Sequence, residues 1–297
     1  MAEPITNLPS PADIAAVITA PPATVAIVGC GWLGLPLARH LLAQGHRVLG
    51  TTTTPEQLPA LTEAGIEARL LRLGAADAPV ADDELTAWLT EAQVQVLVVN
   101  VPPRTAVAGG YPHLLRPLHR AVGAARLGGV VFVSSTGVYP DEPRLMREAD
   151  ALSTRDAASD VLRAEGHFVP RHGQWQSTVL RLGGLFGPGR APGRFLAGRR
   201  ELPLGDAPVN LLHLTDAVGV LGTVIGRGIW GHTLNVCALG HPPRREFYPV
   251  AAALLGLEPP TFLADGAGGK LIDSSRLRAV VPYAFRHDDV LAALADC

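Results

Sequence analysis

The sequence predicts an α/β protein built on a doubly wound parallel sheet, and three observations point to this class. Apolar runs of strand length alternate with helical segments through the first half of the chain. These runs are apolar on both faces, which is typical of parallel strands covered by helices on each side. A glycine-rich turn at residues 29–34 joins the first run directly to the first helical segment. We expect one large domain with a small C-terminal lobe.

Strands and helices are expected to alternate through the first half of the chain. Gly65 follows the second helical segment, where glycine is a favoured helix terminator. Pro102 and Pro103 stop the fourth strand, because proline cannot donate to a strand ladder. We expect strands at residues 24–28, 46–50, 66–73, 94–101 and 129–133, and helices at residues 35–42, 55–64, 82–91 and 111–125.

The second half begins with a less regular pattern and contains a stretch rich in glycine, proline and arginine at residues 183–200. Thr215 or Asp216 would cap one of its helices, since both side chains accept hydrogen bonds from free amides. We expect helices at residues 152–168, 215–225 and 244–255, and strands at residues 178–182 and 233–237.

The glycine-rich turn, Gly29-Cys30-Gly31-Trp32-Leu33-Gly34, is the clearest functional signal. Gly29 permits a tight turn out of the strand, and Gly31 lets a pyrophosphate approach bare backbone. Gly34 lets the helix pack close to the sheet, so that its N-terminal amides face the anion. Because a strand precedes the turn and a helix follows it, the turn predicts a Rossmann-type dinucleotide site that includes Trp32 and Leu33.

These elements predict three regions along the chain. Residues 1–22 form a flexible N-terminal arm. Residues 23–182 form an NAD(P)-binding Rossmann domain, whose sheet is completed by about residues 208–240. The substrate-binding lobe consists of residues 183–207 and 241–297.

Composition excludes several classes of partner. Lys and Arg number 25 against 27 Asp and Glu, without a basic stripe, so neither nucleic acid nor a membrane surface is expected as a partner. The longest apolar stretches have the length of strands rather than of a membrane span. Cys30, Cys237 and Cys297 lie far apart without ligand spacing, which predicts reduced thiols, no metal and a cytoplasmic location. We expect a small-molecule substrate, and a homodimer stays open.

Five motifs then follow one another in a set order. They are the glycine turn and residues 133–139, 180–190, 210–217 and 234–236. This series resembles the extended short-chain dehydrogenases/reductases, the NAD-dependent epimerase/dehydratase group, over about residues 24–290. The glycine turn and residues 270–277 resemble an atypical branch described as nucleoside-diphosphate-sugar epimerases. The resemblance implies an NAD(P)-dependent oxidoreductase or epimerase/dehydratase-like enzyme that acts on a carbonyl or sugar-nucleotide substrate. It also places Asn100, Val101, Pro102, Ser134 and Gly183 beside the cofactor.

The catalytic pair of that family is missing. Family members carry a Tyr, with a Lys four residues later, on the helix after the fifth strand. Here these positions fall on Ala157 and Val161, and Lys270 is the one lysine of the chain. An alternative hypothesis is therefore a non-catalytic NADP-binding sensor or regulatory protein.

Other side chains are candidates for the chemistry. Thr136 matches the position whose hydroxyl polarises the substrate carbonyl, although Ser134, Ser135 and Thr136 would equally satisfy turn amides. Tyr139 is then the nearest candidate proton donor, and a phenol with a pKa of about 10 serves only as an acid.

Two arginines are candidates for binding the substrate. Arg190 and Arg194 would bind a phosphate or carboxylate group, because guanidinium groups match such anions in two-point contacts. A solvated basic surface is the alternative explanation for both.

The end of the second strand bears on the choice of cofactor. An acidic residue there binds the ribose hydroxyls of NAD and repels a 2′-phosphate. This chain has Thr51, Thr52, Thr53 and Thr54 instead, and its first acidic residue is Glu56. The sequence therefore favours NADP, with NAD as the alternative. The arginine that NADP-preferring members often carry is absent, with Thr53 in its place.

Overall fold

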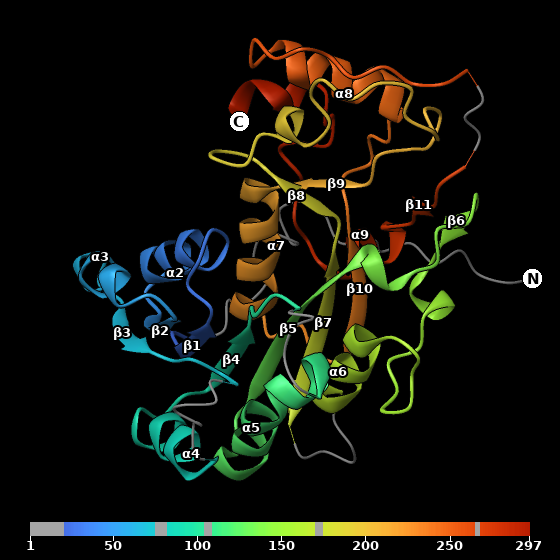
Figure 1. Cartoon of the computed structure of the whole chain (residues 1–297). Coiled ribbons are helices and arrows are strands. Elements are labelled where there is room, and N and C mark those ends of the chain that lie inside the picture. The colour runs from blue at the N-terminus through green and yellow to red at the C-terminus, as the bar shows by residue number, and fades with distance from the viewer. Residues whose placement is uncertain (1–20, 75–81, 104–108, 170–174, 265–267) are drawn as a thin grey trace, which may run out of the picture.

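A computed structural model describes residues 21–74, 82–103, 109–169, 175–264 and 268–297 (Figure 1). The predicted N-terminal arm lies outside the described residues as far as residue 20. None of the helices in the described ranges is long and apolar enough to cross a membrane.

A seven-stranded sheet, parallel throughout, forms the centre of the molecule in the order β10-β7-β5-β4-β1-β2-β3. Its strands are β1 (Thr24–Val28), β2 (Arg47–Thr52), β3 (Glu67–Leu70), β4 (Val96–Val99), β5 (Gly129–Ser135), β7 (Gln176–Leu182) and β10 (His232–Val236). The first strand in the sequence, β1, lies inside the sheet, and β2 and β3 extend from it to one edge. The chain then crosses back and places β4 on the other side of β1. This reversal between β1 and β4 confirms the doubly wound class and marks the crevice where ligands of such sheets bind.

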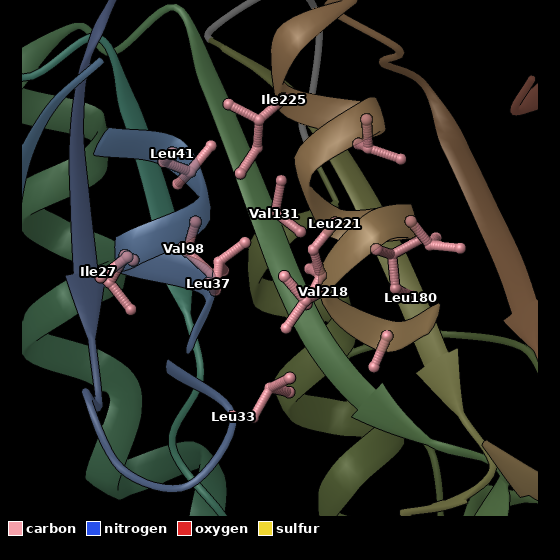
Figure 2. Packing of buried hydrophobic residues seen from close by; sticks show 14 of the residues in the cluster. Ile27, Leu33, Leu37, Leu41, Val98, Val131, Leu180, Val218, Leu221 and Ile225 are labelled. Carbon is pink, nitrogen blue, oxygen red and sulfur yellow. The ribbon is translucent and has the colours of Figure 1, made fainter. Parts of the chain in front are cut away.

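Helices cover both faces of the sheet, as the alternation within each strand requires. Val25 and Ile27 of β1 pack with α2 (Gly34–Ala43) and α7 (Leu214–Gly226), whereas Ala26 and Val28 pack on the opposite face. Figure 2 shows the first face, with Leu37 and Leu41 of α2 and Leu221 of α7 against Ile27, Val98, Val131 and Leu180. The opposite face is covered by α4 (Asp82–Glu91), α5 (Gly110–Ala125) and α6 (Asp160–Phe168).

Short elements connect the edge strands to these helices. After β2 the chain forms the 3-10 turn η1 (Pro55–Gln57) and α3 (Leu58–Glu63), whose Leu61 packs in the core of the first face. Together these two elements replace the single helix expected at residues 55–64.

A smaller lobe stands beyond the carboxyl end of β7 (Figure 1). Here β8 (Gly184–Phe186) pairs with β9 (Leu211–His213), so that β9 is not part of the large sheet. Phe186 and Phe247 are buried in a separate core of this lobe. Its remaining elements are η4 (Pro192–Phe195), α8 (Arg244–Ala253) and η5 (Ala292–Asp296).

Beside the lobe, the short strands β6 (Leu145–Met146) and β11 (Leu271–Ile272) form a two-stranded sheet. The 3-10 turns η2 (Thr136–Val138) and η3 (Glu148–Asp150) flank β6, and α9 (Ser275–Val280) follows β11. The sequence pattern predicted none of these elements, since two-residue strands carry no periodicity of their own.

The start of α6 and the cap of α7 also differ from the predictions. Helix α6 begins at Asp160 rather than near residue 152, because the buried Arg181 holds the carbonyl of Ala151 at 2.8 Å in the preceding segment. The cap of α7 is His213, whose Nδ1 accepts a hydrogen bond from the amide of Thr215. Asp216 is instead buried, and its carboxylate accepts hydrogen bonds from the C-terminal segment, two of them from the amides of Arg286 and His287.

Candidate cofactor and active site

The glycine turn between β1 and α2 is held from two neighbouring strands. The amide of Gly29 donates to Thr51 Oγ1 at 3.1 Å, and the amide of Cys30 donates to the carbonyl of Thr51 at 2.7 Å. From the end of β4, Asn100 Nδ2 donates to the carbonyl of Gly29 at 2.9 Å. These bonds fix the turn at the crevice between β1 and β4.

Each glycine of the turn meets a different environment. Gly29 has a φ of +106°, and a Cβ there would lie 2.3 Å from the carbonyl oxygen of Asn100. A Cβ on Gly34 would lie 2.1 Å from the carbonyl oxygen of Gly29, so this position serves the packing of α2. A Cβ on Gly31 would meet nothing within 4 Å, which leaves open space beside bare backbone. That arrangement fits a pyrophosphate at Gly31, next to a helix start without a side-chain cap.

A cavity of about 610 Å³ opens beside this turn at the carboxyl ends of the strands. Its size lies within the range of roughly 300–1,000 Å³ for cofactor and ligand pockets. Of the predicted cofactor residues, Gly29, Gly31, Trp32, Leu33, Thr51, Thr52, Thr53, Asn100, Val101, Pro102, Ser134 and Gly183 line it. Gly34 does not line the cavity, since it lies behind the turn. The donor set and the open glycine therefore fit NAD or NADP.

Ser135 lines the cavity, whereas the predicted residue, Thr136, does not. Strand β5 runs through Ser135, which lines the cavity, and Thr136 begins the following 3-10 turn. Thr136 is buried outside the cavity, so the substrate-facing role predicted for it is corrected. Ser135 Oγ accepts a hydrogen bond from the amide of Gly137 at 3.1 Å, so it satisfies a turn amide and keeps its own proton. The sequence named Ser135 only as a residue that would satisfy turn amides, because no local pattern shows where β5 ends.

Tyr139 does not reach the cavity, which corrects its predicted role as a proton donor. The side chain is 3 % exposed, and its hydroxyl donates to Asn235 Oδ1 at 2.6 Å. The same oxygen accepts a hydrogen bond from Arg181 Nη1 at 2.7 Å. Burial raises the pKa of this phenol, so it stays neutral and its proton is committed to the amide of Asn235. Tyr139 is thus part of the protein scaffold.

A buried ion pair organises the region behind Ser135. Arg181 Nη2 donates to Glu165 Oε2 at 2.8 Å, and both side chains are fully buried. Ser134 donates to Glu165 Oε1 and Ser153 to Glu165 Oε2, each at 2.5 Å. Because Ser134 also lines the cavity, this network fixes the wall at the end of β5.

Tyr111 is the one phenol among the described cavity-lining residues, and sequence reasoning did not single it out. It lies in the first turn of α5, and its hydroxyl donates to the carbonyl of Val101 at 2.5 Å. Burial raises the pKa of Tyr111 well above its ordinary value. The hydroxyl proton of Tyr111 is therefore engaged by a backbone carbonyl of the cavity wall and is not available to a bound substrate.

Apolar residues occupy the two positions at which the family carries its catalytic Tyr and Lys, and their neighbours do not replace the missing groups. Val161 lines the cavity, and Ala157 packs against the cluster that contains Tyr139. Lys270, the one lysine of the chain, donates from Nζ to the carbonyl of Tyr139 at 2.8 Å. It lies outside the cavity lining and therefore does not supply the missing ammonium group.

Arg190 is the one charged side chain among the described residues that line the cavity. Its guanidinium lies 5.4 Å from the ring centre of Trp32, and the Trp32 indole N–H donates to the carbonyl of Pro188 at 2.8 Å. This contact joins the smaller lobe to the glycine turn. Arg194 lies exposed in η4 outside the cavity, so its predicted place beside Arg190 at a substrate is corrected.

Comparisons with known proteins agree with this architecture. The sequence profile of the NAD binding domain of 6-phosphogluconate dehydrogenase matches residues 24–120. Protein YeeZ of Escherichia coli K12 is 37 % identical over 271 residues, which are 90 % of this chain and 97 % of YeeZ.

Solved structures share the fold over nearly the whole chain. A protein assigned as an NAD-dependent epimerase/dehydratase from Methylobacillus flagellatus is 25 % identical with a TM-score of 0.69, over 92 % of this chain and 96 % of that one. Human epimerase family protein SDR39U1 (isoform 2), solved with NADPH, is 18 % identical with a TM-score of 0.66, over 91 % and 97 %. The protein thus has an NAD-binding Rossmann domain, and it belongs to the family of protein YeeZ within the epimerase/dehydratase branch of the extended short-chain dehydrogenases/reductases.

Proposed function

We propose that this protein is an NADP(H)-dependent oxidoreductase or epimerase/dehydratase-like enzyme that acts on a small carbonyl or sugar-nucleotide substrate without a Tyr-x-x-x-Lys pair. The observation that carries the proposal is one cavity that is lined both by the glycine turn and by Ser135 at the end of β5. When bound, the nicotinamide cofactor supplies the hydride chemistry. The protein contributes binding, orientation and a hydrogen-bond donor.

Three groups of residues divide this work. The open backbone at Gly31 and the start of α2 hold the pyrophosphate. The apolar side chains of Val161 and Leu185 form part of the cavity wall and limit water there. Ser135 donates a hydrogen bond from its hydroxyl to the substrate oxygen and polarises the carbonyl, and a water molecule supplies the proton that accompanies the hydride.

The cofactor proposal favours NADP over NAD. Among the described residues that line the cavity, none is Asp or Glu, so no carboxylate is placed there to repel a 2′-phosphate. Thr51, Thr52, Thr53 and Thr54 all line it instead.

The test is turnover of NADPH with a panel of carbonyl compounds and sugar nucleotides, followed by Ser135→Ala. Removing one preorganised donor should lower kcat by roughly 100-fold, while the affinity for NADPH stays the same. Thr136→Val is the matched control, since this neighbouring hydroxyl lies outside the cavity. Equal turnover in wild type and Ser135→Ala would reject the role of Ser135.

A second candidate function is supported by the same site. A cavity in which Val161 stands at the predicted Lys position would suit a protein that binds NADP without turning it over and signals its redox state. If no compound in the panel is consumed and NADPH binding changes the oligomeric state, the sensor hypothesis replaces the enzyme.

A further inference from the structure

We propose that Arg72 makes this protein selective for NADP(H) by binding the 2′-phosphate of the adenosine ribose. The inference rests on the proposed dinucleotide site and deepens it. The sequence has Thr53 at the place where NADP-preferring members often carry an arginine. The structure brings Arg72 to Thr53 from the segment that follows β3, 19 residues further along the chain.

Strand pairing positions Arg72. In the register of β2 and β3, Thr52 lies opposite Leu70, and the amide of Leu71 donates to the carbonyl of Thr52 at 2.9 Å. Beyond this pairing, Arg72 Nε donates to the carbonyl of Thr53 at 3.0 Å. One N–H group thus anchors the guanidinium at the carboxyl end of β2, which is where the adenosine ribose binds in dinucleotide sites.

The rest of the guanidinium is available. Within the described ranges of the chain, the two Nη groups of Arg72 have no hydrogen bond and no carboxylate partner, and the side chain is exposed. The arginines within β2 and β3 are engaged: Arg47 pairs with Glu67, and Arg69 pairs with Glu84. Among these arginines, Arg72 is therefore the one whose guanidinium can reorient to bind an anion.

The surroundings of Arg72 suit a phosphate. Its sequence neighbours Leu71 and Leu73 line the cavity, as do Thr53 and Thr54, whereas the Arg72 side chain is exposed outside the lining and would meet a 2′-phosphate only at the solvent side of the site. Thr52 Oγ1 donates to Gln57 Oε1 at 2.7 Å and accepts from the amide of Thr54, so this hydroxyl is already used. The exposed hydroxyls of Thr53 and Thr54 remain to donate to phosphate oxygens beside the guanidinium.

Calorimetric titration of wild type and Arg72→Gln with NADPH and NADH tests this proposal. Loss of a charged hydrogen-bond donor should weaken NADPH binding about tenfold or more and leave NADH binding unchanged. Adenosine 2′,5′-bisphosphate, compared with 5′-AMP, probes the 2′-phosphate alone and should show the same loss.

Arg47→Gln is the matched control, since it removes one positive charge from the opposite end of β2. At about 3.3 Å per residue, the start of β2 is some 17 Å from Thr52, beyond the Debye length of about 8 Å at physiological salt. Arg47→Gln should leave both affinities unchanged.

The outcomes separate this proposal from the one it rests on. Equal affinity of the wild type for NADPH and NADH, or equal weakening of both by Arg72→Gln, would overturn the role of Arg72 and leave the dinucleotide site intact. Binding of neither dinucleotide by the wild type would overturn both.

Discussion

Gly31 and Gly34 belong to one motif, yet the structure requires glycine at the two positions for different physical reasons. A Cβ on Gly31 enters the open space where the pyrophosphate would lie, whereas a Cβ on Gly34 collides with the carbonyl of Gly29. A sequence motif cannot separate binding from packing in this way. The geometry of the turn can, because it shows what each added atom would meet.

Gly31→Ala and Gly34→Ala should therefore fail in different assays. Gly31→Ala should keep the melting temperature of the wild type and weaken NADPH binding about tenfold, the equivalent of roughly 1.4 kcal/mol. Gly34→Ala should destabilise the fold by about 1–3 kcal/mol, as overpacking does. Thermal unfolding and calorimetric titration of both variants check this. A stable Gly31→Ala that binds NADPH as the wild type does would contradict the placement of the pyrophosphate.

The end of strand β5 is held by a polar network that reaches several other elements. Glu165 of α6 accepts hydrogen bonds from Arg181 of β7 and from Ser134 of β5. Arg181 also binds Tyr139, which reaches Asn235 of β10. One buried carboxylate thus aligns the strands on which the cavity wall depends.

Glu165→Gln should destabilise the protein strongly, by about 3–5 kcal/mol, because it leaves the buried guanidinium of Arg181 without a counter-charge. The matched control is Glu67→Gln, which removes a carboxylate from an exposed pair with Arg47 and should cost less than about 1 kcal/mol. Urea unfolding of both variants measures the difference. Similar losses in the two variants would show that the network does not hold the strands.

Much of the architecture follows from patterns that the sequence displays directly. The predicted limits of the strand at 24–28 and the helix at 82–91 agree with the structure. Pro22 and Gly29 bound the apolar run of the strand, and the apolar residues of the helix, Leu85, Trp88 and Leu89, recur at helical spacing. The glycine turn could be predicted for the same reason, since its six residues are contiguous.

Other features depend on contacts between distant residues. Arg72 reaches Thr53 through the register of β2 and β3, and Tyr139 is enclosed because Arg181, 42 residues later, binds its hydroxyl. The cavity position of Ser135 depends on where β5 stops. No local pattern carries this information, which is why the sequence pointed to Thr136 and Tyr139 rather than to Ser135 as residues that face the cavity.

The central claim is that the cavity beside the glycine turn binds a nicotinamide dinucleotide. Calorimetric titration of the whole protein with NADPH tests it most directly, with the fluorescence of Trp32 in the cavity wall as a second signal. We predict micromolar binding with one site per chain, tighter than for NADH. The absence of heat and of any fluorescence change with either dinucleotide would contradict the claim, and with it the proposed enzyme and the proposed sensor.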